Sequence, residues 1–234
     1  MREIVFDTET TGLDNKTDRI IEIGCIELEN QFPTGRTLHL FINPDGRKVH
    51  PDALAVHGIT DAFLADKPLF SEVAEQIAAF FEGARYVAHN ATFDMGFLNS
   101  EYQRIGLPAV APDVVIDTLS LARRRHPMGP NSLDALCRRY GIDNSHRTRH
   151  GALLDAELLM DVYIEMLGGR QAALGLSNSD DAAEARNRSD EIVEIGERPR
   201  ALPQRLTNAE RQAHAVLIDR IGAKALWHKL AGGN

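Results

Sequence analysis

Alternating apolar and polar residues at the start of the chain predict a set of β-strands. The segment 4–12 opens with Ile-Val-Phe-Asp-Thr-Glu, and the segments 19–29 and 37–42 show a similar period of two. This period places successive side chains on opposite faces of a strand. A short turn at 32–35 separates the second strand from the third, and short connections favour antiparallel neighbours. The first three strands are therefore predicted to form a meander.

Farther along, the apolar residues take the spacing of amphipathic helices. A brief helical turn is predicted within 50–61, and a helix over 71–82 with Val73 and Ile77 on its apolar stripe. Further strands are predicted at 86–89 and 114–117, and further helices at 92–105, 119–125, 132–140 and 151–167. A meander that leads into alternating strands and helices predicts an α/β fold, with a mixed five-stranded sheet flanked by helices.

Composition divides the chain into three parts. Residues 1–169 carry the strand and helix patterns, whereas residues 170–199 are rich in Ala, Ser, Asn, Asp, Glu and Arg and contain few large apolar residues. Such a composition is typical of a flexible linker. Structure is expected again in 200–234, where Thr207 and Glu210 form a capping-box pattern before apolar residues at helical spacing. We therefore expect one domain with a flexible C-terminal tail.

The overall charge and the cysteines restrict the classes of function. The 234 residues carry a formal net charge of −8, which argues against a protein that holds nucleic acid through bulk positive charge. Any contact with nucleic acid must be local or mediated by metal ions. The two cysteines, Cys25 and Cys137, have neither metal-ligand nor disulfide spacing, so we expect them in the core. No apolar run is long enough to span a membrane, and a cytoplasmic location is expected.

Two carboxylates interrupt the first strand. Asp7 and Glu9 share a strand face with Val5, so their side chains lie next to each other. Like charges in this arrangement repel, and a divalent cation would relieve the repulsion. The same Asp-x-Glu pattern also occurs on solvated strand faces, so it indicates a metal site only if other residues support it.

Two further carboxylates occupy predicted helices. Asp94 falls in the first turn of the helix 92–105, where an aspartate can simply interact with the helix dipole. Asp155 is harder to explain structurally, because it lies on the buried stripe of the helix 151–167. The other members of that stripe are Ala152, Leu159, Val162 and Met166. A carboxylate on a buried face is costly unless it is paired or bound to metal.

His150 adds a titratable group near these acids. It stands five residues before Asp155, with Gly151 between them, and is therefore expected on the loop that leads into the helix. An isolated loop histidine is usually only solvated. Four acids that bind two divalent cations about 4 Å apart, with a histidine that takes a proton from water, would suit in-line displacement at phosphorus.

Three segments carry a resemblance to a known family. They are Asp7-Thr8-Glu9-Thr10-Thr11-Gly12, His89-Asn90-Ala91-Thr92-Phe93-Asp94 and His150-Gly151-Ala152-Leu153-Leu154-Asp155. They resemble the three motifs of the exonucleases named for three aspartates, one glutamate and a histidine. The likeness covers about residues 3–169, including 56–59 and 131–137, and within the family it is closest to the proofreading subunits of bacterial DNA polymerase III. It implies a ribonuclease-H-like fold, which agrees with the predicted mixed sheet.

The resemblance also implies roles for individual residues. Asp7, Glu9 and Asp155 would bind two Mg²⁺ or Mn²⁺ ions directly, Asp94 would bind partly through water, and His150 would be the general base. The implied contacts to the terminal nucleotide come from Asp7, Glu9, Leu13, Asp52, His57, Phe93 and Asp155. For Leu13 and Phe93 the alternative is packing in the core.

The implied activity is removal of mononucleotides from single-stranded or frayed DNA 3′ ends within a replicative polymerase. An exoribonuclease of the same family is the nearest alternative, although it would not need the C-terminal tail. A protein that mainly bridges the polymerase and the sliding clamp is the alternative from another class. The intact set of catalytic residues argues against a purely structural role.

The tail contains two candidate binding segments. Gln171, Leu174 and Leu176 resemble the short peptides with which bacterial replication proteins bind the sliding clamp, although Leu176 replaces a stronger Phe. Residues 200–231 are expected to bind the alpha subunit of DNA polymerase III, with Trp227 as the anchor. A plain linker and a helix that folds back on its own domain are the respective alternatives.

One basic concentration stands out in this acidic chain. It comprises Arg123, Arg124, Arg125, Arg138, Arg139, Arg147 and Arg149. A solvated helix face is the favoured interpretation, and a path for the DNA backbone is the alternative.

Overall fold

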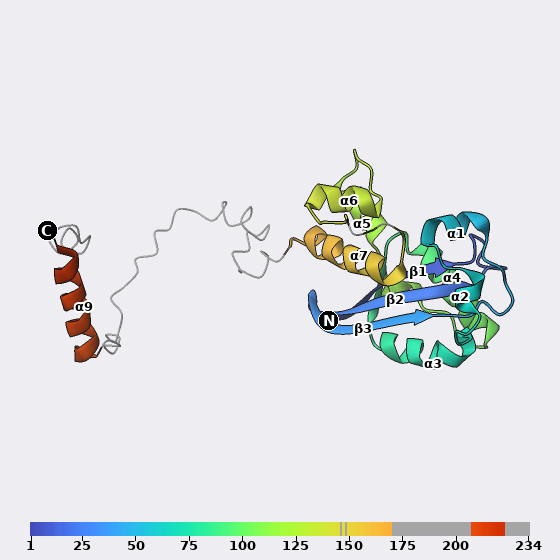
Figure 1. Ribbon diagram of the computed structural model, residues 1–234, viewed down its shortest axis with the longest axis horizontal. Coiled ribbons are helices and arrows are strands. Elements are labelled where there is room, and N and C mark those ends of the chain that lie inside the picture. Colours follow the sequence, from blue (N-terminus) through green and yellow to red (C-terminus); the bar gives the residue numbers. More distant parts are fainter. Residues whose placement is uncertain (146, 148, 170–206, 223–234) are drawn as a thin grey trace, which may run out of the picture. The chain divides into compact units, whose positions relative to one another are not determined.

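The computed structural model describes residues 1–145, 147, 149–169 and 207–222. The elements up to Met166 form the sheet and its covering helices (Figure 1). The helix α9, Asn208–Ile221, belongs to a second unit and is described by itself. The predicted boundaries at 169/170 and 199/200 remain predictions, because the residues between them lie outside the described part of the chain.

The five strands form one mixed sheet, as predicted. Their bounds are β1 Arg2–Thr10, β2 Ile20–Glu29, β3 Phe32–Phe41, β4 Arg85–Ala88 and β5 Val115–Asp117, in the spatial order β3-β2-β1-β4-β5. The strand pairs β1–β2 and β2–β3 are antiparallel, whereas β1–β4 and β4–β5 are parallel. The meander is thus extended by two strands that follow helices.

The predicted turn at 32–35 is wrong, because these residues already belong to β3. The chain reverses at Asn30 and Gln31, whose φ angles are 52° and 69°. Pro33 is tolerated in β3 because this strand lies at the edge of the sheet and pairs only with β2.

The predicted helices are all present, with small shifts at their ends. They are α3 Phe70–Phe81, α4 Thr92–Arg104, α5 Thr118–Arg125, α6 Leu133–Tyr140 and α7 Ala152–Met166. The region 50–61 holds the whole of one short helix, α1 Pro51–His57, and the first residue of another, α2 Asp61–Leu64, instead of a single turn. A 3₁₀ turn, Pro112–Val114, precedes β5.

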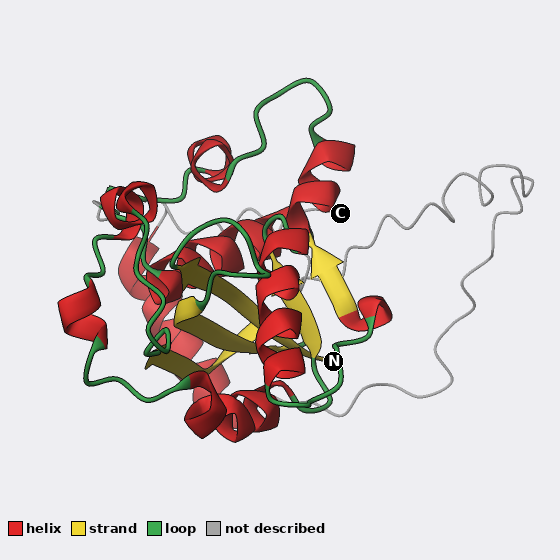
Figure 2. Ribbon diagram, turned by 90° about the vertical axis from the view of Figure 1, so that its right-hand side faces the viewer, coloured by secondary structure: helices red, strands yellow, loops and turns green. Residues whose placement is uncertain are grey.

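Helices cover both faces of the sheet (Figure 2). Ile4 and Phe6 of β1 point to the face covered by α3 and α4, where the largest apolar cluster lies. Val5 points to the opposite face and packs with Leu159 and Tyr163 of α7. The odd-numbered residues of β1 therefore face α7, as the period of two predicts.

The expectation for the cysteines is also met. Cys25 and Cys137 are buried free thiols in the core. Among the described helices, none has both the length and the apolar character needed to cross a membrane.

Candidate active site

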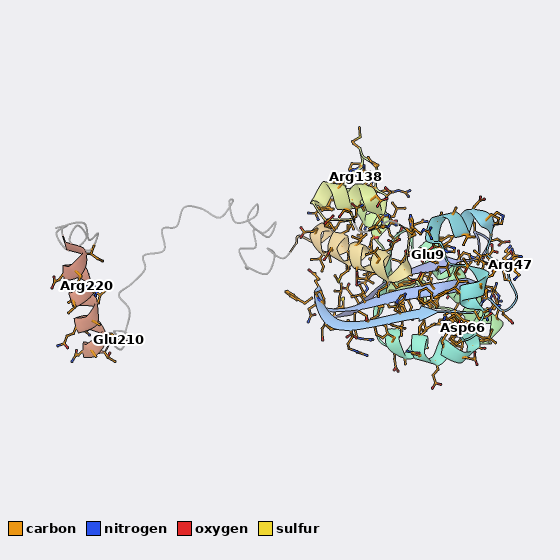
Figure 3. The ribbon with its side chains drawn as sticks, viewed as in Figure 1. Glu9, Arg47, Asp66, Arg138, Glu210 and Arg220 are labelled. Carbon is orange, nitrogen blue, oxygen red and sulfur yellow. The ribbon has the colours of Figure 1, made fainter. Side chains whose placement is uncertain are left out.

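Strand β1 and helix α7 bring three of the four predicted carboxylates together. Asp7 and Glu9 project from the β1 face that α7 covers, and Asp155 lies in the first turn of α7, only 2% exposed. All three line one cavity of about 330 Å³. Glu9 is labelled in Figure 3 in the region between α7 and α1. The buried position of Asp155 confirms the stripe predicted for this helix.

A glycine allows this close approach of helix and sheet. Gly24 of β2 lies opposite Asp7 in the antiparallel pair. A Cβ atom at Gly24 would overlap the backbone of Ala152 and Leu153 in the first turn of α7. The absent side chain lets α7 rest directly on the sheet, so that Asp155 reaches the carboxylates of β1.

Asp94 completes the set of four from α4. Its side chain is 3% exposed and lines the same cavity. Asp94 Oδ1 accepts hydrogen bonds from the backbone N of Thr8, at 3.1 Å, and from Thr8 Oγ1, at 2.7 Å. Asp94 is therefore not an exposed helix cap. It ties the first turn of α4 to β1 between Asp7 and Glu9.

The electrostatics of the cluster favour bound protons when no cation is present. Burial, with neighbouring carboxylates, raises the pKa of Asp7 well above its ordinary value. The same causes raise the pKa of Glu9 from 4.5 to about 8. Burial raises the pKa of Asp94 from 3.8 to about 7, although the hydrogen bonds from Thr8 oppose this. A divalent cation would stabilise the ionised carboxylates and release these protons.

A fifth carboxylate, Glu22, lies beside the site and was not predicted. It faces Glu9 across the β1–β2 pair, is 4% exposed and contributes to the raised pKa of Glu9. His39 Nε2 lies 2.7 Å from Glu22 Oε1. Only the register of the two strands could have shown that Glu22 and Glu9 are neighbours.

His150 lies on the loop before α7, as predicted, and its side chain is 47% exposed. Its Nδ1 is 3.1 Å from Asp155 Oδ2. Ligand atoms of Glu9, His150 and Asp155 all lie within 4.8 Å of one another. His150 is therefore close enough to act on a group bound between these acids.

Arg147 also lies in this cavity, contrary to the interpretation of the arginines as a solvated face. Its side chain is only 8% exposed and pairs with Asp155 and Asp134. The remaining members of the set fit the favoured interpretation better, since Arg123, Arg124, Arg125, Arg138, Arg139 and Arg149 are exposed. Residue type alone could not separate Arg147 from its neighbours.

The carboxylates fit the metal ions that the resemblance implies. Asp7, Glu9, Asp94 and Asp155 offer oxygen ligands from three elements, and their mutual repulsion is incompletely offset by Arg147. Hard divalent cations such as Mg²⁺ and Mn²⁺ prefer such oxygen ligands. The set therefore has both the ligand chemistry and the excess negative charge that two cations would neutralise.

A second cavity, of about 480 Å³, adjoins the first and shares Thr8, Glu9 and Phe93 with it. It is lined by five of the seven residues predicted to contact the terminal nucleotide, namely Glu9, Leu13, Asp52, His57 and Phe93. Leu13 is 86% exposed, so it is not a core residue. Phe93 packs against Phe97 and also lines both cavities, so core packing and nucleotide contact are compatible for this residue.

His57 is one of the buried polar residues that line the second cavity. It is 6% exposed, and its Nδ1 accepts a hydrogen bond from the backbone N of Ile59 at 3.0 Å. Burial lowers the pKa of His57, and the nearby Thr10 backbone partly opposes this shift. Among the described residues, His57 Nε2 has no hydrogen-bond partner. The neutral ring therefore carries its proton on Nε2, which is left for a ligand.

Other residues of the two cavities were missed as site residues. They include His50, His89, Asn90, Ser132 and Asp134. His89 and Asn90 belong to the second motif, so their position in the sequence was a usable signal. Gln171, Leu174, Leu176 and Trp227, by contrast, fall outside the described residues, and their roles remain predictions.

Known proteins resemble the chain in sequence along nearly its whole length. Residues 4–163 match the family described as Exonuclease. The DNA polymerase III subunit epsilon of Haemophilus influenzae is 43% identical, and the alignment covers 100% of this chain and 97% of the relative. The protein of the same name from Escherichia coli is 40% identical, with 97% of each chain covered.

Solved structures agree on the fold. Exonuclease X in complex with 5′ overhanging duplex DNA matches with a TM-score of 0.54 and 30% identity, covering 71% of this chain and 90% of that one. Exonuclease I matches with a TM-score of 0.65 and 20% identity, covering 74% and 42%. On the sequence and fold together, the chain belongs to the exonuclease family and, within it, to the epsilon subunits of DNA polymerase III.

Proposed function

We propose that this chain hydrolyses the 3′-terminal phosphodiester bond of single-stranded or frayed DNA, with two Mg²⁺ or Mn²⁺ ions held by Asp7, Glu9, Asp94 and Asp155. Membership of the epsilon subunits makes the chain a proofreading 3′→5′ exodeoxyribonuclease of DNA polymerase III, and the family is metal-dependent. The choice of ions, the residue roles and the partner contacts are our proposals.

One observation carries the proposal. Four carboxylates from β1, α4 and α7, of which Glu9, Asp94 and Asp155 are buried and Asp7 is half-buried, converge on a single cavity with His150 at its edge. In an isolated protein this arrangement is unfavourable, because desolvation and repulsion both raise the pKa of Asp7 and Glu9. A structural role does not explain such a cluster of carboxylates. A site that holds divalent cations against a phosphodiester does explain it.

The four carboxylates and His150 have distinct tasks. Bound cations would supply a nucleophile at neutral pH and stabilise the charge on the leaving oxygen. Asp7, Glu9 and Asp155 would hold these ions directly, and Asp94 would hold them partly through water from α4, where Thr8 fixes its carboxylate. His150 accepts the proton of the attacking water, because its exposed loop position gives it access to both solvent and site.

The second cavity binds the terminal nucleotide. Leu13 and Phe93 offer apolar surface for the base and sugar, and such stacking tolerates any base. His57 donates from Nε2 to the sugar or the phosphate, which satisfies a buried polar atom that is unpaired here. Asp52 lies at the exposed edge of this cavity.

Selection of mismatches does not require that the bases be read. The two adjoining cavities fit one strand end, and a mispaired end separates from its template more readily than a paired end. A mispaired terminus therefore reaches the site more often.

The C-terminal segment holds the chain to the polymerase. Helix α9 begins at a capping box of Thr207 and Glu210, as predicted, and exposes Val216, Leu217 and Ile221. An isolated helix of this length is marginal in water, so these apolar residues favour a partner. We propose the alpha subunit as this partner, anchored by Trp227, and the sliding clamp as the partner of Gln171, Leu174 and Leu176.

The test is digestion of 5′-labelled oligonucleotides by the purified chain with Mg²⁺, Mn²⁺ or a chelator. We expect single-nucleotide shortening from the 3′ end, faster for a mismatched duplex than for a matched one, and none with chelator. Asp7→Asn should abolish cleavage. Glu3→Gln is the matched control, because Glu3 is a buried carboxylate on the same face of β1 that binds Tyr163 outside the cavity.

The substrate series also separates the alternatives. Cleavage from the 5′ end, or full activity of Asp7→Asn, would contradict the proposed site. Preference for an RNA 3′ end over DNA would favour the exoribonuclease alternative.

A further inference from the structure

Arg147 makes several close contacts in the active-site cavity, although the proposed mechanism gives it no role. Its Nε lies 2.5 Å from Asp155 Oδ1, and its Nη2 lies 2.6 Å from Asp155 Oδ2. Its Nη1 donates to Asp134 Oδ1 at 2.8 Å. The side chain is only 8% exposed, so a full positive charge is buried among the carboxylates of the site.

The bidentate contact occupies both oxygens of Asp155. A guanidinium fork matches a carboxylate in geometry, and charge-assisted pairs of this kind are strong. The same charge lowers the pKa of Asp7 and Glu9, against the effects of burial and repulsion. Arg147 therefore does in part what a bound cation would do, and a cation that binds Asp155 competes with Arg147 for the same carboxylate.

Asp134 gives Arg147 a second attachment that a cation would not disturb. It lies in the first turn of α6, its side chain is 49% exposed, and it also accepts a hydrogen bond from Asn144 at 3.0 Å. Asp134 thus holds the loop that leads to His150 from the α6 side. After Asp155 is released, Arg147 can keep its Nη1 contact while its other nitrogens turn away.

His150 is coupled to the same guanidinium. Arg147 Nη2 lies 2.7 Å from His150 Nδ1, and since arginine only donates, Nδ1 is the acceptor. In this contact a neutral ring carries its proton on Nε2, and the guanidinium occupies the lone pair of Nδ1. His150 therefore cannot accept a second proton at Nδ1. The metal-free arrangement therefore holds both Asp155 and His150 away from catalysis.

We propose that Arg147 is the internal counter-ion of the metal-free site, and that it releases Asp155 and His150 when divalent cations bind while remaining attached to Asp134. This inference rests on the proposed cation site and adds a step to it. Assembly of the active site becomes an exchange of one buried charge for another, which keeps the four carboxylates together until the cations arrive.

The side-chain Nε–H signals of arginine in ¹⁵N-labelled wild-type chain test this exchange during titration with diamagnetic Mg²⁺. The Arg147 signal is assigned by its absence in Arg147→Lys. Its shift should follow the same binding curve that calorimetry gives for the cation. Arg19 is the internal reference, because its Nε forms a similar pair with the buried Glu101, at 2.8 Å, outside both cavities. Its signal should not move.

A second measurement uses Mn²⁺ affinity by calorimetry. Arg147→Gln removes the competing charge, so we expect about tenfold tighter Mn²⁺ binding or more, together with a lower melting temperature of the chelated protein. Saturating Mn²⁺ should remove the difference in melting temperature. Arg149→Gln is the matched control, an exposed arginine on the same loop, and should bind Mn²⁺ like the wild type.

The outcomes separate this inference from the proposed function. If the wild type binds cations but the Arg147 signal stays fixed, or if Arg147→Gln binds Mn²⁺ equally or more weakly, the exchange is refuted and the metal site stands. If the wild type binds no cation at all, the proposed function fails and the inference fails with it.

Discussion

Replacement of Gly24 by alanine should disable the site without touching any proposed catalytic residue. The added Cβ would lie well within 3.0 Å of the backbone of Ala152 and Leu153, whereas ordinary van der Waals contacts begin at 3.4 Å. Both partners are backbone, so no side chain can rotate away. The first turn of α7 must therefore move by about 1 Å, and Asp155 moves with it. A displacement of this size can lower kcat by about 100-fold, and overpacking should lower the free energy of unfolding by about 1–3 kcal/mol.

Steady-state hydrolysis of a single-stranded oligonucleotide, with a thermal melt of the same sample, measures both effects. Gly35→Ala is the matched control, because its site is open and its φ of +83° makes alanine strained there. This control should lose stability but retain kcat. If Gly24→Ala keeps the wild-type kcat and melting temperature, then contact with the sheet at Gly24 does not position Asp155.

Protons, the proposed base and the C-terminal segment each give a further prediction. Since the pKa of Glu9 is raised to about 8 and that of Asp94 to about 7, the folded chelated protein binds protons more tightly than the unfolded chain. The contribution of these two carboxyls to the free energy of unfolding should be fully present below about pH 4 and should be lost, by roughly a few kcal/mol, as pH rises through their folded pKa values of about 7 and 8. Melting curves should lose this slope with saturating Mg²⁺ or in Glu9→Gln, and a slope of opposite sign would refute the cluster. His150→Ala should lower kcat about 10²–10⁴-fold and remove the limb of the pH–rate profile near neutrality; an unchanged profile would exclude His150 as the base. Deletion of 200–234 should leave single-strand hydrolysis nearly unchanged but abolish co-purification with the polymerase, and Trp227→Ala should weaken that association by about 2 kcal/mol or more. Loss of single-strand activity on deletion would instead assign the tail to the exonuclease domain.

Much of the site could be predicted because its carboxylates occupy positions where the period of the helix or strand predicts apolar residues. Asp155 stands on a helical stripe that is otherwise apolar, and the alternation of β1 places Asp7 and Glu9 on one face. Both inferences use only the period of the secondary structure. The mixed sheet followed in the same way, from short connections at the start and alternating elements later.

What was missed depends on long-range register. Arg147 and Arg149 are alike in sequence, and only the fold buries one of them between Asp134 and Asp155. Glu22 becomes a neighbour of Glu9 only when β1 and β2 are paired.

The hairpin between β2 and β3 shows a different limit. The residues Pro33 and Gly35 have turn chemistry, yet the chain reverses at Asn30 and Gln31 with positive φ angles. Glutamine is uncommon in that conformation, so local propensity pointed to the wrong place. Pairing along the edge of the sheet decided the turn instead.

Anomalous diffraction from crystals of the chain soaked in Mn²⁺ is the most direct test of the proposed cation site. The account predicts two Mn²⁺ peaks about 4 Å apart, in contact with Asp7, Glu9 and Asp155 and with Asp94 directly or through water. In that crystal Arg147 should no longer touch Asp155. A single peak elsewhere on the chain, or no peak among these four carboxylates at saturating Mn²⁺, would contradict the account.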